Sequence, residues 1–267
     1  MTMLKYYIIV SVIALLTIPV KASEFSLADE DYKAQKYETA LSLYLEGLEK
    51  EGISAGVYYN LGNVYYKLGK DADAMLCYER AKKLDPRNEQ INNNLEFLKT
   101  KVLDANKGAL GGKAGNVEED RETLMENIYR IIAIERNSNS WAIFAVMAFI
   151  LFLLATSLYV FTPNVLARKT GFFSGLVFLG FTIIFLIFSF LAASEYENKD
   201  NVILMEYSSA LLNQPNEKAS AATTQLHGGT KLKVVERKTA PDGSKWLKVK
   251  LNHDNSGWVK ESSVEAI

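Results

Sequence analysis

The residue types that most often carry out catalysis are sparse in this chain and follow no recognisable catalytic spacing. Its histidines, His227 and His253, both lie in stretches rich in turn-forming residues, and its single cysteine is Cys77. The sequence contains no HExxH zinc motif, no nucleophile elbow, no phosphate-binding loop and no paired cysteines. We therefore expect a protein that is not an enzyme and that uses no metal ion or organic cofactor.

The remaining charged and reactive groups have simple structural interpretations. Cys77 lies between Leu76 and Tyr78, and we expect it to be buried as a small apolar residue. The acidic run at residues 118–120 is typical of the first turn of a helix, where carboxylates favour the helix dipole. The formal net charge is -1 over 267 residues, so no global field favours a nucleic-acid partner.

Residues of similar type recur at a spacing of 34 positions in the first part of the chain. The recurring sets are Leu27, Leu61 and Leu95; Ala40 and Ala74; Tyr44 and Tyr78; and Gly47 with Ala81. A period of about 34 residues is typical of helix–turn–helix units that bury their apolar faces only against neighbouring copies. We therefore expect a helical array over residues 23–105 that binds other polypeptides.

The clearest copy spans residues 55–88 and resembles the tetratricopeptide repeat (TPR) family. The positions that carry the resemblance are Tyr58, Leu61, Gly62, Tyr65, Ala74, Tyr78, Ala81 and Pro86. Gly62 and Ala74 are expected to let the two helices cross closely, with the tyrosines filling the hairpin core. Residues 89–104 begin a third copy but lose the pattern before a second helix, so we expect them to cap the array.

Part of the first helix in this copy is expected to face a protein ligand. These candidate binding residues are Tyr59, Asn63, Tyr66 and Lys67. An Asn–Lys pair on this face resembles repeats that grip the terminal carboxylate of a peptide. That interpretation needs a second cation from the third copy, which Gln90, Asn93 and Asn94 do not supply. The alternative is that these are solvated polar positions of an ordinary helix.

The middle of the chain is predicted to enter a membrane. Residues 106–118 are rich in glycine and are expected to form a flexible linker, followed by an amphipathic helix over residues 119–138. Residues 139–161 and 172–193 carry no charged side chain and are long enough to be transmembrane helices, joined by a loop at 162–171. The absence of ionisable groups in both spans argues against a transporter or a proton path.

Two features predict the orientation in the membrane. Residues 1–22 are typical of a signal peptide, with Lys5 before an apolar stretch and Ala22 at the cleavage position; an uncleaved anchor is the alternative. The predicted loop holds Arg168 and Lys169, whereas Glu195 and Glu197 follow the second span. The positive-inside rule therefore places the loop in the cytoplasm and both soluble parts in the periplasm of a bacterial inner (cytoplasmic) membrane.

Residues 201–267 are expected to form an all-β barrel. Candidate strands are 202–205, 231–237, 245–251, 257–260 and the last few residues, with turn signals between them. The segments 229–230, 246–249 and 257–260, with Val264, resemble bacterial SH3-like domains. Leu247, Val249 and Leu251 share one strand face, which we expect to form the core.

Trp246 lies on the opposite face of that strand, with Lys248 and Lys250. In the SH3 family the matching aromatic lines the ligand groove, so Trp246 is a further candidate for protein binding. The usual Pro and Tyr of the groove correspond here to Lys260 and Ser263, which leave poor walls for a polyproline ligand. Trp246 is therefore either a ligand contact or a shield for the barrel rim.

The complete order of segments resembles the tetratricopeptide member of the Bacteroides-type aerotolerance (Bat) protein set. The resemblance implies a multi-domain membrane protein that acts with other Bat proteins, several of them carrying von Willebrand A domains, in tolerance of oxidative or envelope stress. Two functions stay open. The first is an inner-membrane scaffold that recruits protein partners in the periplasm, and the second is an envelope protein that binds peptidoglycan through the SH3-like domain.

Overall fold

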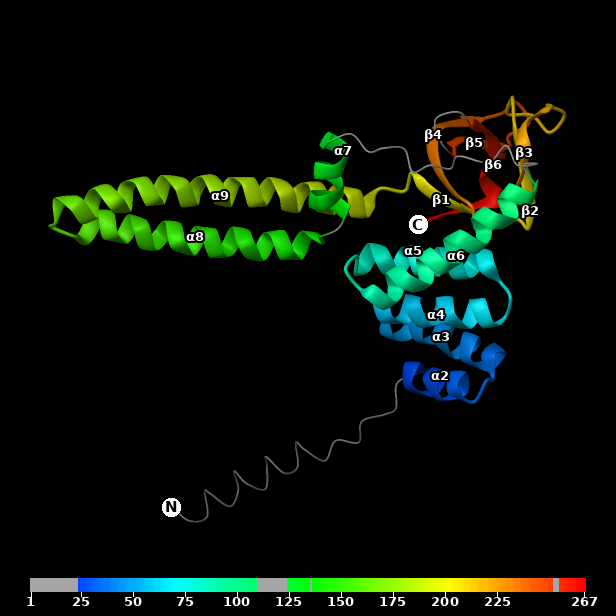
Figure 1. The fold of residues 1–267 in the computed structure, drawn as a ribbon, viewed down its shortest axis with the longest axis horizontal. Helices are drawn as coiled ribbons and strands as arrows, with labels where there is room; N and C mark the ends of the chain where they lie inside the picture. Colours follow the sequence, from blue (N-terminus) through cyan, green and yellow to red (C-terminus); the bar gives the residue numbers. More distant parts are fainter. Residues whose placement is uncertain (1–23, 110–123, 135, 252–254) are drawn as a thin grey trace, which may run out of the picture. The chain divides into compact units, whose positions relative to one another are not determined.

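The computed structural model describes residues 24–109, 124–134, 136–251 and 255–267 (Figure 1). The predicted signal peptide, most of the predicted linker, the acidic run at 118–120 and His253 lie outside these ranges. The chain divides into two compact units with the boundary after Gly52.

The first unit contains helices α2 (Glu24–Lys33) and α3 (Tyr37–Glu51). They cross so closely at Gly47 that a Cβ atom there would lie 2.4 Å from the ring of Phe25. Ala28, Ala40 and Tyr44 are buried in the same contact. Ala40, Tyr44 and Gly47, which recur in the 34-residue period, are therefore helix-packing residues in this unit.

The second unit begins with the helical hairpin formed by α4 (Ala55–Lys67) and α5 (Asp71–Leu84). A Cβ atom at Gly62 would lie 2.5 Å from the ring of Tyr78, and Ala74 is fully buried. Gly69 adopts a φ of 73°, which ends α4 in the left-handed conformation that glycine favours. The two small residues therefore stand where the helices approach each other, as the sequence predicted.

Helix α6 (Glu89–Ala109) supplies the predicted capping helix but is longer than expected. We expected a flexible linker from residue 106, and this boundary is wrong because the helix continues to Ala109. Asn106 is buried, where its side-chain amide donates to Thr230 Oγ1 at 3.0 Å and its Oδ1 accepts from the His227 backbone N–H at 2.8 Å. These partners lie more than 120 residues later in the chain, so local composition gave no sign of them.

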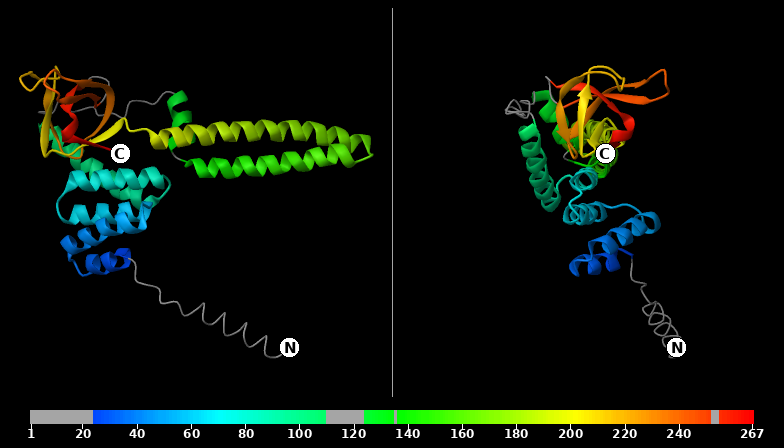
Figure 2. Two further views of the ribbon diagram at one scale, coloured as in Figure 1. Left: turned by 180° about the vertical axis from the view of Figure 1, so that it is seen from behind. Right: turned by 90° about the vertical axis from the view of Figure 1, so that its right-hand side faces the viewer.

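Two long apolar helices, α8 (Ser138–Phe161) and α9 (Val165–Glu197), run antiparallel and side by side (Figures 1 and 2). Both are long and apolar enough to cross a membrane. The expected ten-residue loop at 162–171 is much shorter, because α9 already begins at Val165. Asn164 caps α9 by accepting a hydrogen bond from the Leu166 N–H at 2.9 Å, so Arg168 and Lys169 belong to its first turns.

The amphipathic helix expected over residues 119–138 is not one continuous helix. Within the described residues it consists of α7 (Leu124–Tyr129) and the π-helical turn η1 (Arg130–Ile134), after which α8 begins separately at Ser138. Asn137 caps α8, with its side-chain oxygen accepting from the Ser140 N–H at 3.0 Å. This cap explains the break, because it fixes the start of α8 at a polar residue ahead of the apolar stretch.

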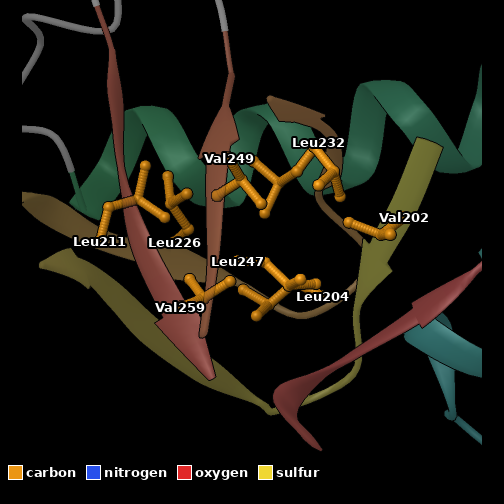
Figure 3. Close-up of a cluster of buried hydrophobic side chains, with 9 residues drawn as sticks. Val202, Leu204, Leu211, Leu226, Leu232, Leu247, Val249 and Val259 are labelled. Atoms are coloured by element: carbon orange, nitrogen blue, oxygen red, sulfur yellow. The ribbon is translucent and has the colours of Figure 1, made fainter. Parts of the chain in front are cut away.

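The C-terminal segment forms one antiparallel sheet of seven strands, in the order β3-β2-β6-β5-β4-β1-β7, that curves into a half-barrel. The strands are β1 (Asn201–Leu204), β2 (Ser208–Leu212), β3 (Ala221–His227), β4 (Lys231–Thr239), β5 (Lys245–Lys250), β6 (Ser256–Lys260) and β7 (Val264–Ala266). Five strands were expected; β2 and β3 were missed, since neither shows clear apolar–polar alternation. The predicted core face is confirmed: Leu247 and Val249 are buried (Figure 3) and Leu251 packs against them.

The half-barrel packs directly against α5 and α6. Ile203 of β1 is fully buried in the same cluster as Ala74, Leu95 and Leu98. Beside it, Gly229 has a φ of 87° and lies so close to α6 that an added Cβ would be 3.1 Å from Val102. The apolar surface that a further repeat helix would cover is therefore covered by a strand. We call α4–α6 together with β1–β7 the repeat–sheet body.

Candidate functional site

Three of the four candidate residues on α4 lie next to α6. The side-chain oxygen of Asn63 accepts hydrogen bonds from the Tyr78 hydroxyl at 2.7 Å and from the Asn94 amide at 2.9 Å. The same Asn94 amide donates to the Tyr59 hydroxyl at 3.3 Å. Because Asn63 is engaged inside the helical packing, it joins α4 to α5 and α6 and is not presented to a peptide carboxylate.

Tyr66 is half-buried and forms the base of a small exposed surface. The ring of Phe97 meets it edge-on, with centroids 5.9 Å apart, and the ammonium of Lys101 lies 5.3 Å above its ring. Phe97 is 59% exposed. Lys67 is exposed at the end of α4. We call Tyr59, Tyr66, Lys67, Phe97 and Lys101 the α4–α6 face.

Two members of this face were missed from the sequence, although the repeat period contained the signal for them. Phe97 and Lys101 stand 34 positions after Asn63 and Lys67 respectively. The second cation that the carboxylate-binding interpretation required is therefore present in the third copy, as Lys101. Its ammonium is 2.7 Å from an Asp71 carboxylate oxygen, so it is held beside Tyr66 by an ion pair.

The surface of α6 beside Phe97 is hollowed. A depression of about 510 Å³ is lined by Asn93, Glu96, Phe97, Thr100, Lys101 and Asp104. It combines one large apolar ring with amide, hydroxyl and charged groups. This mixture suits an aromatic or aliphatic anchor of a peptide, flanked by polar contacts.

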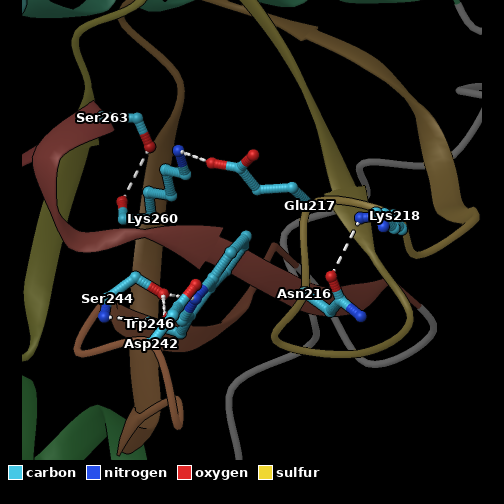
Figure 4. Close-up of polar contacts among 8 residues, drawn as sticks. All are labelled: Asn216, Glu217, Lys218, Asp242, Ser244, Trp246, Lys260 and Ser263. Carbon is cyan, nitrogen blue, oxygen red and sulfur yellow. Dashed lines mark hydrogen bonds and ion pairs between the residues drawn. The ribbon is translucent and has the colours of Figure 1, made fainter.

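Trp246 is only 2% exposed and belongs to the half-barrel's internal packing. Its indole N–H donates to Ser244 Oγ at 2.7 Å, and the Ser244 hydroxyl donates to Asp242 Oδ1 at 2.6 Å (Figure 4). The hydrogen bonds from Ser244 lower the pKa of Asp242. This arrangement favours the interpretation of Trp246 as a shield of the rim.

Lys260 and Ser263, which occupy the positions of the usual SH3 groove residues, also form contacts within the half-barrel. Lys260 is paired with Glu217 of the β2–β3 loop, and the buried Ser263 hydroxyl donates to the Lys260 carbonyl at 2.8 Å (Figure 4). The half-barrel instead exposes a different aromatic, Tyr207, which is 86% exposed and meets the ring of His227 at 5.9 Å. Tyr207 was missed because it lies between β1 and the unpredicted strand β2.

The titratable groups within the described ranges form no cluster of three or more His, Cys, Asp or Glu side chains that could hold a metal ion. Cys77 is buried as predicted, and this burial raises the pKa of its thiol to about 12. A thiol with so high a pKa is almost entirely protonated at neutral pH and is a poor nucleophile. The ring of His227 contacts the ring of Tyr207.

Comparison with known protein families matches two segments of the chain. Residues 55–88 match the tetratricopeptide repeat, and residues 195–265 match the GW (Gly-Tryp) dipeptide domain. No curated protein matches the chain. The first match confirms the repeat at 55–88, and the two together support an architecture of tetratricopeptide helices followed by a bacterial SH3-like domain.

The structure gives a reason for the Gly-Trp dipeptide at Gly257 and Trp258. A Cβ atom at Gly257 would lie 2.7 Å from Leu211 Cβ, so only glycine lets β6 pass β2 at this distance. Trp258 is buried beside it. A tetratricopeptide repeat suggests protein–protein interaction, and a GW domain suggests binding to the cell wall.

Proposed function

We propose that this protein is a membrane-anchored scaffold that binds protein partners through its α4–α6 face. The observation that carries the proposal is the exposed Phe97 on α6, which meets Tyr66 edge-on beside the Lys101 ammonium, with the exposed Lys67 at the end of α4. Aromatic and cationic residues in one patch are the types that contribute most to protein interfaces. The tetratricopeptide match at residues 55–88 supports the same function.

The α8–α9 hairpin is the proposed membrane anchor. It is apolar over a length sufficient to cross the hydrocarbon core, and its large side chains point outward. Arg168 and Lys169 lie near the turn, so the positive-inside rule supports a cytoplasmic turn with both soluble parts in the periplasm, on the outer side of the inner membrane. The expected signal peptide supports the same orientation.

The resemblance to the Bat set suggests the partners and the process. We infer that the partners are other Bat-type membrane proteins, including those with von Willebrand A domains, and that the complex serves aerotolerance or envelope stress. The protein would act without catalysis, because the chemistry of its face is that of a binding surface.

The test compares exposed residues only, since Tyr59 and Tyr66 pack partly against the core and their removal would disturb the fold. The full chain is purified from solubilised membranes as wild type and as Phe97→Ala with Lys67→Ala. The matched control is Val235→Ala with Lys218→Ala, an exposed apolar residue and an exposed lysine of the half-barrel. We expect the first variant to lose its co-purifying membrane partners and the control to keep them; equal recovery would contradict the proposal.

A second candidate function is binding of peptidoglycan through the half-barrel, which the GW match at residues 195–265 favours. Tyr207, with its exposed ring beside His227, is the aromatic that a wall saccharide could stack on. Sedimentation of the full chain with purified peptidoglycan, compared between wild type and Tyr207→Ala, tests this function. Loss of sedimentation in the variant supports it, and absence of sedimentation in the wild type rejects it.

A further inference from the structure

A cavity of about 440 Å³ lies where α5 and α6 meet the start of α8, the end of α9 and strand β4. Its lining is strongly basic, with Lys82, Lys83, Lys99, Arg136 and Lys231. The acidic side chains in the lining are Glu79 and Glu195. The cationic side chains that line this cavity therefore outnumber the acidic ones.

Glu79 organises this cavity without neutralising it. The side chain is almost completely buried, with Oε2 2.8 Å from the Lys231 ammonium and Oε1 3.4 Å from that of Lys99. The second acid, Glu195, accepts a hydrogen bond from the Tyr129 hydroxyl at 2.9 Å. Glu79 thus fixes two lysines in place and leaves the other cations of the lining without an equally close carboxylate.

Among those remaining cations, Lys83 donates to the backbone carbonyls of Asn198 and Ile267 at 2.8 and 3.0 Å, which leaves Lys82 and Arg136. Among the residues that the structure describes, no carboxylate lies within ion-pair distance of either one. Burial, together with the positive charge of Lys99, lowers the pKa of Lys82. Like charges held together in a partly dry space destabilise one another, and a bound anion would remove that cost.

The cavity also lies at the end of the α8–α9 hairpin, where lipid headgroups would lie if the hairpin spans a membrane. The Arg136 guanidinium lies 5.1 Å above the ring of Trp141 and 5.3 Å above that of Phe144, at the beginning of α8. Ala192 and Tyr196, at the end of the apolar part of α9, form the opposite wall. Trp, Tyr and Arg at the end of an apolar helix are typical of the membrane–water interface.

We propose that this cavity binds a phosphate group, and that its source is the headgroup of an acidic phospholipid beside the α8–α9 hairpin. Lys82 and Arg136 donate to the phosphate oxygens, while Glu79 holds Lys99 and Lys231 in the cavity wall. Charge-assisted hydrogen bonds of this type are strong, and Arg is suited to two oxygens at once. The proposal rests on the membrane anchoring given under the proposed function.

The test uses the full chain in an uncharged detergent and titration calorimetry with three probes. These are dihexanoyl phosphatidylglycerol, the zwitterionic dihexanoyl phosphatidylcholine, and inorganic phosphate. The variants are Lys82→Gln and Arg136→Gln, with Lys218→Gln as a control that removes the same charge from an exposed loop of the half-barrel. Neither test variant breaks an ion pair among the described residues, and melting temperatures equal to wild type verify folding.

We expect saturable binding of phosphatidylglycerol, at least tenfold weaker binding of phosphatidylcholine, and a loss of about tenfold in each test variant but none in the control. Inorganic phosphate that binds equally well with the same sensitivity to the variants would support the phosphate site and overturn the lipid as its source. Equal binding of phosphatidylglycerol by wild type and both variants would overturn the site. Carbonate extraction of the same variants from membranes reports on anchoring separately, and should show all of them retained.

Discussion

The α8–α9 hairpin and the repeat–sheet body place their large apolar side chains on opposite sides. In the hairpin the buried residues are small, such as Ala145, Gly171 and Thr182, and large ones such as Phe173 (65% exposed) point outward. In the body large residues such as Leu98 and Ile203 are fully buried. One chain therefore carries one region whose large apolar side chains are enclosed and another whose large apolar side chains lie on its surface, on two helices that are long and apolar enough to cross a membrane.

The comparison teaches that burial alone does not identify a core. A helix pair can be tightly packed and still keep its apolar area outside, because in lipid the close approach of backbones replaces the hydrophobic effect as the source of association. In the body, by contrast, the large apolar residues are inside, so replacing one of them with a small residue should lower the free energy of unfolding.

Ala74→Glu should have the largest effect. It introduces a carboxylate at a fully buried position between α4 and α5, among buried apolar side chains. We expect a loss of several kcal/mol in the free energy of unfolding and the loss of cooperative melting by circular dichroism. Ala105→Glu, at an exposed position of α6, is the control and should melt like wild type. An unchanged Ala74→Glu would mean that the repeat frame is wrong.

Leu98→Ala should destabilise the body by about 3 kcal/mol. Leu98 is fully buried between the repeat helices and Ile203, so its truncation removes apolar contacts and leaves a cavity. Chemical denaturation of the purified chain measures the loss. Because strand β1 shares this cluster, the helical and sheet signals should shift together, and separate transitions would show that the two are not one body.

Glu79→Gln should lower the free energy of unfolding by about 2 kcal/mol at neutral pH. This is less than the roughly 3–5 kcal/mol lost when a fully buried ion pair is broken, because the Lys99 and Lys231 side chains are each 39% exposed. Burial would raise the pKa of Glu79, but Lys231 and Lys99 together hold it below its ordinary value of 4.5.

The sign of the pH dependence follows from this lowered pKa. The folded chain holds the Glu79 proton less tightly than the unfolded chain, so the stabilisation is present above pH 4.5 and is lost as the pH falls through the folded-state pKa below 4.5. Melting temperatures of wild type and Glu79→Gln, measured from pH 7 to 3, should therefore converge at the acid end. A constant difference across the range would show that ionisation of Glu79 contributes nothing.

Phe173→Ala should have the smallest effect, under about 0.5 kcal/mol in detergent or lipid, because the ring faces outward from the hairpin. Phe173→Ala removes a larger apolar side chain than Leu98→Ala does. Comparing the two variants therefore shows whether the size of the side chain or its burial determines the loss of stability. A loss as large as that of Leu98→Ala, measured in the same detergent, would mean that the outer face of α9 packs against protein.

Sequence reasoning was most successful where the signal is local or periodic. The 34-residue period located Gly62, Ala74 and Tyr78 at the helix crossing, and apolar length located α8 closely. The same signal found α9 but placed its start at residue 172, whereas the helix begins at Val165. The period also contained Phe97 and Lys101, which were missed because the third copy was interpreted only as a cap. Reading every position of the partial copy would have found them.

Other features depend on contacts between distant residues and could not be predicted. Asn106 is helical because its side chain bonds with Thr230 and the His227 backbone, and Ile203 completes a helical core from a strand. Trp246 lies on the opposite face of β5 from the core residues Leu247 and Val249. It is nevertheless buried, and its indole N–H bonds to Ser244. A period of two indicates which residues share a face, but not whether that face is covered.

The most direct test of the scaffold function is site-specific photocrosslinking in living cells. A benzoylphenylalanine in place of Phe97 should form a discrete adduct with a membrane protein partner, because this side chain is exposed at the centre of the α4–α6 face. The adduct should weaken when Lys67 is changed to Gln, and the same probe at the exposed Val235 should give none. Absence of an adduct at position 97, or the same adduct from position 235, would contradict the account.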